Sequence, residues 1–428
     1  MKPIPGLNKQ GFWFLAHSGL LYLGLFGVTD VLLNFFFISL GYDNATIGFL
    51  QGLPRLGGLL TGIPLGIYAS RIGSRRITVY ATLGLAVSYS MVVLWPTLTM
   101  LAASRFLVGL FYGATQIAAS PLMMGLASRT YQTHLFSYHS VVTMVSTSAG
   151  SLIAGYLPAL VVLVYVPAQV VESAPVVTQS AYAYSGALLI VGVIIALSAV
   201  PLGRLVDDRP HAPPDLPTAE APPQPVELPL RQVPWGHLSL LSLPFLLFGF
   251  TGGLTFPFYN MFFRQTYGLS DEVVGFILSL GWLGMGLVTL TNPWWDKRFG
   301  RAVALGIVMT LAAVAFLMLG AAQTLFFSVV AFVLGISIRN MMSPLFQPLL
   351  MESVPANLQN IISSVSFVIW NIGYMAATLL AGSWLDTRGF AFIYSVVAVG
   401  VFLTGLVVYL IFRNRTPYSE PDPALQGG

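Results

Sequence analysis

Four ionisable side chains lie within long apolar stretches of this sequence. One is a carboxylate, Asp30, and three are guanidinium groups, Arg55, Arg105 and Arg339. A charge placed in a hydrocarbon layer costs about 3 kcal/mol even on forgiving insertion scales, so a charge kept there commonly binds a ligand, an ion or a proton. These four residues are the first candidates for a functional site.

Asp30 is a candidate proton-coupling residue. Asp30 and Arg55 lie thirteen residues before and twelve residues after Asp43, which marks a turn. A helix rises about 1.5 Å per residue, so the two side chains should lie at nearly the same depth. Paired with Arg55, Asp30 would stay ionised and tie two helices together. Desolvated and unpaired, it would bind a proton near neutral pH. The sequence leaves both alternatives open.

Further residues are expected to line a cavity with Asp30. Asn34 follows Asp30 by four residues and therefore shares its helical face. In later stretches, Pro257 predicts a kink. For each aromatic candidate, packing or anchoring at the membrane surface is the alternative to a role in the cavity. The remaining cavity candidates are Tyr259, Trp370, Asn371 and Tyr374.

Arg339 lies near the middle of its apolar stretch, next to Asn340, and the apolar stretches of its half hold no carboxylate. An unpaired buried guanidinium is costly, so Arg339 must meet backbone carbonyls, water, Asp30 or an anionic group of a substrate. Three arginines and one aspartate would give the cavity a net positive charge, which favours an anionic or zwitterionic small-molecule substrate. Arg105 should add less to this charge, because we expect its side chain to extend to the outer surface.

The composition excludes a water-soluble protein. Of 428 residues, 56% are hydrophobic and only 8% are charged, against about 25% charged in soluble domains. The net charge of +4 comes from short segments between apolar stretches, so nucleic acid is not an expected partner. The chain has no cysteine, no Gly-Lys-Ser/Thr phosphate loop and no hydrolase signature. We therefore expect no enzymatic activity, no cofactor and no metal site.

Twelve apolar stretches position these residues. Each has roughly the 20 residues needed to cross a membrane, and continuous apolar stretches predict helices, because the backbone finds no water there. The predicted spans are residues 12–39, 47–69, 77–95, 99–125, 137–165, 180–201, 238–260, 272–291, 302–320, 325–350, 360–383 and 390–412.

Lysine and arginine mark one side of these spans, and the side rich in them is cytoplasmic in membrane proteins. The opposite loops hold only Arg264 and Arg388. We expect an integral inner-membrane protein with both termini in the cytoplasm. The basic residues on the cytoplasmic side are Lys2, Lys9, Arg71, Arg75, Arg76, Arg129, Arg204, Arg209, Arg231, Lys297, Arg298, Arg301, Arg413 and Arg415.

Residues 203–236 are polar and rich in proline. Such a segment cannot bury enough apolar surface to fold alone, so it predicts an extended, mobile cytoplasmic linker. The linker divides the chain into an N-terminal six-helix bundle at residues 1–202 and a C-terminal six-helix bundle at residues 237–413. A cytoplasmic tail follows at residues 414–428.

The two halves resemble each other. At a constant offset of 227 residues, glycine, phenylalanine and arginine residues of the first half fall on identical residues of the second half. Parallel repeats of six helices predict two pseudo-symmetric bundles that face one another across a central cavity. The matched pairs include Gly41 with Gly268, Gly48 with Gly275, Arg71 with Arg298 and Gly73 with Gly300.

The segment after the second span, Gly66-Ile-Tyr-Ala-Ser70-Arg71-Ile-Gly73-Ser-Arg75-Arg76, resembles the cytoplasmic Gly-x-x-x-Asp-Arg-x-Gly-Arg-Arg signature of the major facilitator superfamily. Ser70 replaces the acid of that signature. In the second half, Asp296-Lys297-Arg298-Phe299-Gly300-Arg301 keeps the basic and glycine positions and displaces the acid by one residue. The resemblance covers nearly the whole chain. It implies an all-α membrane protein of twelve transmembrane helices in two six-helix bundles.

The resemblance also implies a gating role for these loops, which in the family hold the bundles together in the outward-facing state. The alternative is that their arginines only set the orientation. The candidate gating residues are Gly66, Arg71, Gly73, Arg75, Arg76, Asp296, Arg298, Gly300 and Arg301.

The function that the resemblance implies is secondary active transport of a small organic solute by alternating access. Asp30 makes proton coupling the expected driving force, and we expect a monomer. One alternative is an exporter of amphipathic or drug-like compounds, because the segment from Ser146 to Gly155 resembles a degraded form of the glycine-rich antiporter motif. The other is a membrane sensor or scaffold on the same fold that transports nothing.

Overall fold

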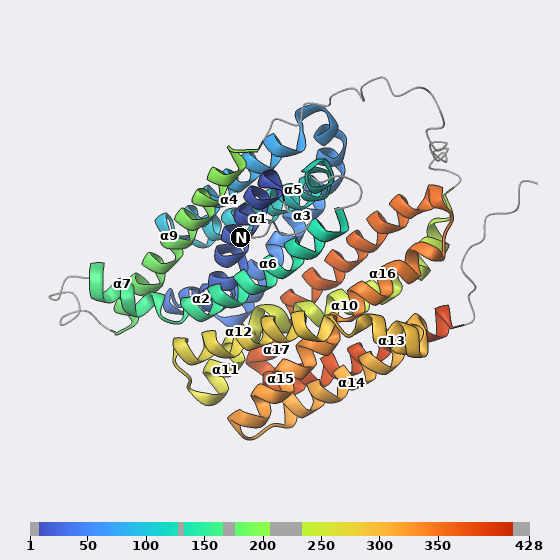
Figure 1. Cartoon of the computed structure of the whole chain (residues 1–428). Coiled ribbons are helices and arrows are strands. Elements are labelled where there is room, and N and C mark those ends of the chain that lie inside the picture. The colour runs from blue at the N-terminus through green and yellow to red at the C-terminus, as the bar shows by residue number, and fades with distance from the viewer. Residues whose placement is uncertain (1–7, 127–131, 166–175, 206–232, 414–428) are drawn as a thin grey trace, which may run out of the picture.

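The computed structural model describes residues 8–126, 132–165, 176–205 and 233–413, and within these ranges it leaves out the side chains of residues 62–72 and of a few others. The described residues form two bundles of helices, one on each side of the segment between Leu205 and Val233 (Figure 1). Most of the predicted linker and the predicted tail lie outside the described residues.

The N-terminal bundle is coloured blue to green in Figure 1. Its first helix is continuous through a π-helical turn, η1, and α5 packs against both α3 and α4. The helices of this bundle are α1 (Lys9–Tyr22), η1 (Leu23–Val28), α2 (Thr29–Ser39), α3 (Asn44–Ile72), α4 (Ser74–Leu94), α5 (Leu98–Leu126), α6 (Gln132–Ala154), α7 (Leu157–Tyr165) and α9 (Val176–Leu202).

The C-terminal bundle is coloured yellow to red. Its centre is the long α17, which packs against α10 and α14. The helices of this bundle are α10 (Trp235–Thr255), the short 3-10 turn η4 (Phe256–Phe258), α11 (Tyr259–Tyr267), α12 (Asp271–Thr289), α13 (Asn292–Phe299), α14 (Arg301–Ala321), α15 (Leu325–Asn340), α16 (Met342–Glu352) and α17 (Ala356–Phe412).

Nine helical stretches of the described chain are long and apolar enough to cross a membrane, and a tenth is formed by α6 and α7, which meet at a bend of 48°. The longest stretch, α17, breaks at Gly389, where φ is 73° and ψ is 177°. It therefore contains two of the predicted spans, and α3 corresponds to the predicted span 47–69. The predicted all-helical fold is confirmed. The number of twelve spans stays a prediction, and the described helices are compatible with it.

Two helices are interrupted near the middle of the molecule. η1 ends just before Asp30, and it packs closely on α6, where a Cβ added to Gly27 would lie 2.6 Å from the Gly150 Cα atom. Such π turns inside helices are frequent at functional sites. In the other bundle, η4 contains Pro257 and confirms the predicted kink.

The backbone supports the internal repeat. Of the five described glycines with left-handed φ values, four pair at the predicted offset: φ is 85° at Gly41 and 63° at Gly268, and it is 91° at Gly73 and 73° at Gly300. A residue with a Cβ would be strained at these positions. Each pair therefore occupies the same turn in its bundle, which is a more specific match than shared composition.

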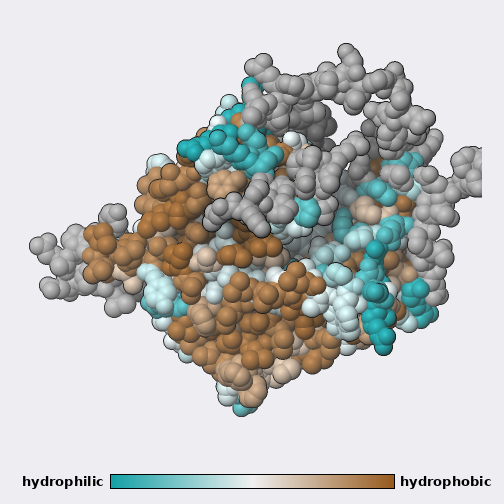
Figure 2. Space-filling model, in the orientation of Figure 1, coloured by the Kyte–Doolittle hydropathy of each residue, from teal (hydrophilic) through white to brown (hydrophobic). Residues whose placement is uncertain are grey.

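The flanks of both bundles are apolar. Figure 2 shows broad hydrophobic areas over the flanks and hydrophilic patches toward the upper and right-hand ends. Leu163, Leu290 and Phe326 point outward and are 83%, 74% and 71% exposed. Water-soluble proteins rarely expose such continuous apolar surface, so these flanks face lipid and the chain is an integral membrane protein.

The bundles meet along two seams of small residues. Where α3 meets α17, a Cβ added to Gly48 would lie 2.4 Å from the carbonyl oxygen of Thr378. Where α6 meets α12, one added to Gly275 would lie 2.4 Å from the carbonyl oxygen of Ser151. Small residues allow helices to approach this closely.

Each seam also contains a second close contact at a glycine, and these two contacts correspond to each other. Gly382 lies against Asn44, and Gly155 lies against Asp271. Gly155 and Gly382 are themselves 227 residues apart, so the two seams are related by the internal repeat. We call the end of the molecule with these seams, near the turn at Gly41, the outer end, because the predicted orientation places it outside the cytoplasm.

Candidate functional site

A cavity of about 310 Å³ lies between the bundles, and along α3 it begins at Gln51, just past the seam at Gly48. This volume is at the lower end of the range of about 300–1,000 Å³ typical of ligand sites. Three predicted candidates, Asp30, Arg55 and Arg105, supply the charged part of its lining. Aromatic side chains of both bundles supply much of the rest, and these are Phe26, Tyr89, Tyr112, Phe256, Trp282, Trp370 and Tyr374.

Asp30 and Arg55 face this cavity without forming an ion pair with each other. The ion pairs in the described part of the chain involve other carboxylates, although Asp30 is within electrostatic reach of Arg105 and Arg55. The static pair considered from the sequence is therefore not the arrangement in this structure. Within the described ranges, no group of three His, Asp or Glu side chains could hold a metal ion.

Arg55 stacks on aromatic rings of the other bundle. Its Cζ atom lies 3.9 Å from the ring centroid of Tyr374 and 4.7 Å from that of Trp370. Each such contact contributes about 0.5–2 kcal/mol, depending on desolvation. The two ring centroids are 5.5 Å apart, so both rings lie to adjacent sides of the guanidinium, and among the described residues its N–H groups have no hydrogen-bond acceptor.

Arg105 corrects one prediction, because its side chain does not extend to the outer surface. It is 6% exposed, and its Nη2 donates to Gln51 Oε1 at 2.9 Å while its Nη1 donates to Tyr89 Oη at 3.5 Å. Its Nε is buried without a partner among the described residues. Polar partners inside the bundle accept hydrogen bonds from two of its three nitrogens, so the side chain does not need to reach the membrane surface.

Asn34 corrects a second prediction, because it closes the outer side of the cavity instead of lining it. It is 1% exposed, it accepts a hydrogen bond from Gln51 Nε2 at 2.7 Å, and its Nδ2 donates to Asn260 Oδ1 at 3.0 Å and to the carbonyl of Pro257. Asn260 in turn donates to the carbonyl of Val31 at 2.9 Å. A buried amide needs partners for its donors and acceptor, and the other bundle supplies most of them.

Arg339 lies outside the cavity lining and is held within its own bundle. It is 3% exposed, and its Nη2 donates to the carbonyl of Phe248 and to Thr251 Oγ1, the latter at 3.2 Å. Its Cζ atom also lies 4.0 Å from the ring centroid of Phe248. The sequence left backbone carbonyls, water, Asp30 or a substrate anion as partners of Arg339. In this structure its partner is a backbone carbonyl, together with a threonine hydroxyl.

The other candidates divide between cavity and packing. Trp370 and Tyr374 line the cavity. Tyr259 packs edge-on against Phe332, Asn371 donates to the carbonyl one turn before it, and Asn340 ends α15 partly buried. Tyr259, Asn371 and Asn340 are therefore not part of the cavity lining in this conformation, which corrects their prediction as cavity residues.

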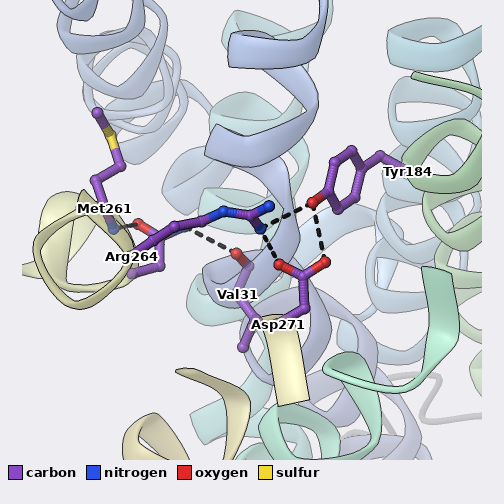
Figure 3. Close-up of polar contacts among 6 residues, drawn as sticks. Val31, Tyr184, Met261, Arg264 and Asp271 are labelled. Atoms are coloured by element: carbon purple, nitrogen blue, oxygen red, sulfur yellow. Dashed lines mark hydrogen bonds and ion pairs between the residues drawn. The ribbon is translucent and has the colours of Figure 1, made fainter. Parts of the chain in front are cut away.

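A cluster that the sequence did not suggest joins the bundles at the outer end (Figure 3). Arg264 and Asp271 form an ion pair, Arg264 Nη1 donates to Tyr184 Oη at 2.9 Å, and Tyr184 Oη donates to Asp271 Oδ2 at 2.9 Å. The Cζ atom of Arg264 lies 4.5 Å from the ring centroid of Phe35. Phe35 and Tyr184 belong to the N-terminal bundle and the charged pair to the other, so we call these four residues the outer latch.

The loops that resemble the family signature are partly described. Gly66 and Arg71 lie in the part of α3 whose side-chain environment is not described. Arg75 donates to the carbonyls of Leu202 at 2.9 Å and Gly203 at 3.1 Å, and so caps α9 of its own bundle. Arg76 lies at the surface.

In the second half, Asp296, the acid displaced by one residue from its place in the signature, forms an ion pair. Asp296 accepts from Arg301 Nε at 3.1 Å, and Arg301 Nη1 donates to Glu352 at 2.5 Å. Arg298 is exposed, and Gly300 provides the turn into α14. The described contacts of both loops thus stay within one bundle, and their gating role stays a prediction.

Several residues of the cavity lining were not predicted from the sequence. Gln51 lies one helical turn before Arg55, and Tyr112 follows Arg105 by seven residues, so helical spacing from the candidate charges could have found both. Trp282 and Phe256 carried no such signal, because they approach the charges only through the packing of the two bundles.

The chain is similar to a family of membrane transporters and to several solved structures. The model of the Major Facilitator Superfamily matches residues 15–374 and, a second time, residues 241–427. Comparison with curated proteins gives no match. One similar solved structure is a bacterial homolog to the human lysosomal transporter Spinster in an inward-facing and occupied conformation, with 14% identity, coverage of 97% of this chain and 100% of that chain, and a TM-score of 0.71.

Two further solved structures show the same fold. The POT family transporter PepTSo has 13% identity, with 97% of this chain and 100% of that chain covered and a TM-score of 0.71. A variant of the E.coli fucose:proton symporter FucP has 16% identity, with 95% and 98% covered and a TM-score of 0.58. Because the family model matches most of its length, this chain belongs to the major facilitator superfamily.

Proposed function

We propose that this chain is a secondary active transporter that moves a small organic solute by alternating access and couples this movement to protons through Asp30. The observation that carries the proposal is the cavity between the bundles. Asp30 and Arg55 of one bundle face it together with Trp370 and Tyr374 of the other. A solute bound there would contact both bundles, so its binding would change the free energy of their relative movement.

The position of the contacts between the bundles supports alternating access. Among the described residues, these contacts run from the outer latch and the seams at Gly48 and Gly275 to the contact of Arg55, the twelfth residue of α3, with Trp370, and to that of Gly286 with Met144. With the predicted orientation, the outer end is closed. A rocking movement that separates the seams would expose the same cavity to the outside.

Similar proteins support solute transport as the class of function. One structure of this fold is named as a fucose:proton symporter and another as a POT family transporter. A proton-coupled carrier needs a titratable group that senses the substrate, and Asp30 is the carboxylate among the residues that line the cavity.

The test is transport by the purified protein in proteoliposomes. We expect labelled solute to exchange against unlabelled solute inside the vesicles, and an inward proton gradient to drive its accumulation. If no solute from a broad panel exchanges while the protein is folded and inserted, the chain is not a transporter. If exchange occurs but a proton gradient drives no accumulation, the protein transports without proton coupling.

Export of amphipathic compounds is a second candidate function, and the aromatic lining of Phe26, Phe256, Trp282 and Trp370 favours it. Everted membrane vesicles separate the two directions. Uptake of an amphipathic dye into everted vesicles indicates export, whereas accumulation only in right-side-out vesicles indicates import.

A further inference from the structure

Arg55 presents unused hydrogen-bond donors to the cavity. Its Cζ atom lies over the rings of Tyr374 and Trp370 of the opposite bundle, whose centroids are 5.5 Å apart, so the two rings contact adjacent sides of the guanidinium and restrict its position. Among the described residues, its N–H edge has no acceptor. A planar guanidinium held in this way matches a carboxylate, which accepts two parallel hydrogen bonds.

Asp30 presents the complementary group. Its carboxylate lines the same cavity, and among the described residues it has neither an ion-pair partner nor a hydrogen-bond donor. An ionised carboxylate needs donors when it is removed from water, and an ammonium group supplies both donors and the opposite charge.

Arg105 is a weaker candidate than Arg55 for binding a ligand carboxylate. Two of its nitrogens already donate to Gln51 and Tyr89, which are neutral. Among the described lining residues, Arg55 and Asp30 are the charged groups without any hydrogen-bond partner, whereas Arg105 has only its Nε unpaired, and aromatic rings line much of the cavity around them.

We propose that the cavity binds a zwitterionic amphipathic solute, with its carboxylate on Arg55, its ammonium group near Asp30 and its apolar body against the aromatic side chains. This inference rests on the proposed function and names its substrate class. A solute with one charge leaves either the guanidinium edge or the carboxylate without a partner, and an unsatisfied buried polar group is the main source of discrimination in such sites.

The test uses a matched panel of ligands with the full-length protein in lipid nanodiscs. L-phenylalanine carries both charges, 3-phenylpropanoate lacks the ammonium group, 2-phenylethylamine lacks the carboxylate, and 2-phenylethanol is neutral. The dipeptide alanylphenylalanine places the charges further apart. Binding is measured near neutral pH by calorimetry and by tryptophan fluorescence, because Trp282 and Trp370 line the cavity.

We expect phenylalanine or alanylphenylalanine to bind about ten- to a hundredfold more tightly than the singly charged and neutral compounds, which is the range of one charge-assisted hydrogen bond. Equal or tighter binding of a singly charged or neutral compound overturns the inference. Failure of both zwitterions to bind overturns it as well.

Two variants assign the charges. In Arg55→Gln, phenylalanine and 2-phenylethylamine should bind alike, and in Asp30→Asn, phenylalanine and 3-phenylpropanoate should bind alike. Arg388→Gln removes an exposed arginine at the outer end and should keep the selectivity of the unchanged protein. If either cavity variant is folded and retains full selectivity, its residue does not bind the group assigned to it.

Transport measured on the same panel separates this inference from the proposed function. Selective binding of a zwitterion that proteoliposomes do not exchange would leave the ligand class intact and remove the transport function. Exchange of 3-phenylpropanoate or 2-phenylethylamine in preference to both zwitterions would leave the transport function intact and remove the ligand class.

Discussion

Asp30 is the residue through which a proton could enter the transport cycle, because it lines the cavity without an ion-pair partner among the described residues. Asp30→Asn keeps the shape of the side chain and fixes it in the neutral form. We expect this variant to lose proton-driven accumulation and to retain exchange of solute down its gradient. Proteoliposome uptake with and without a pH gradient measures both.

A matched control for this prediction lies in the turn before α3. Hydrogen bonds from Thr46 hold the pKa of Asp43 below its usual range, so Asp43 stays ionised around neutral pH and cannot carry protons there. Asp43→Asn should therefore keep the pH dependence of the unchanged protein. Accumulation that survives in Asp30→Asn with the same pH dependence would contradict coupling at Asp30.

Arg339 joins α10 to α15 through the carbonyl of Phe248 and the hydroxyl of Thr251. Arg339→Ala should abolish transport while the protein still inserts, because the contacts that hold these helices together are lost. Hydrogen bonds of a charged group contribute about 2 kcal/mol, so we also expect a lower thermal unfolding temperature in detergent. Unchanged transport kinetics in a folded Arg339→Ala protein would show that these contacts are dispensable.

At the scale of helices, the seams determine how closely the bundles approach. A Cβ on Gly275 would lie 2.4 Å from a backbone oxygen of α6, whereas a Cβ on Gly306 would meet its nearest neighbour at 3.7 Å. Gly275→Ala should therefore open the outer end, and Gly306→Ala serves as the matched control on α14. Because the chain has no cysteine, Val108→Cys introduces a single thiol into the cavity lining.

The measurement is the rate at which a membrane-impermeant thiol reagent, added from outside, labels this cysteine. We expect faster labelling with Gly275→Ala and no change with Gly306→Ala. Equal rates in both would mean that the α6 and α12 seam does not limit access from the outside.

The outer latch should stabilise the same closed arrangement. Tyr184→Phe keeps the ring and removes the hydroxyl that bonds to Arg264 and Asp271. A lost hydrogen bond to a charged group corresponds to about 1.5 kcal/mol, so labelling of the Val108→Cys thiol from outside should become roughly tenfold faster. Tyr182→Phe is the control, because Tyr182 is 56% exposed on the flank of the bundle. The latch is not a barrier if the two variants label at the same rate.

At the scale of the whole molecule, the distribution of lysine and arginine predicts the orientation. A cysteine introduced at Arg388 should react with an impermeant reagent in intact cells, and one introduced at Arg413 should react only after the membrane is made permeable. The opposite pattern would reverse the orientation and with it the assignment of the outer end.

The sequence by itself determined the class of protein, the approximate limits of its helices and the residues that carry charge into the membrane. These features follow from local composition, because a span must be apolar over its whole length and a buried charge stands out against it. The repeat was also visible in the sequence, and the left-handed glycines at Gly41, Gly73, Gly268 and Gly300 give it a structural basis.

Only the tertiary structure decided which of these residues share the cavity. Helical spacing places Asn34 on the same face as Asp30, yet contact with the other bundle draws Asn34 into the closed outer side. Arg105 and Arg339 are equally conspicuous in the sequence, but one lines the cavity and the other bonds within its own bundle. A sequence records which residues lie on one helix, whereas the partners of a buried charge depend on how two bundles far apart in the chain pack against each other.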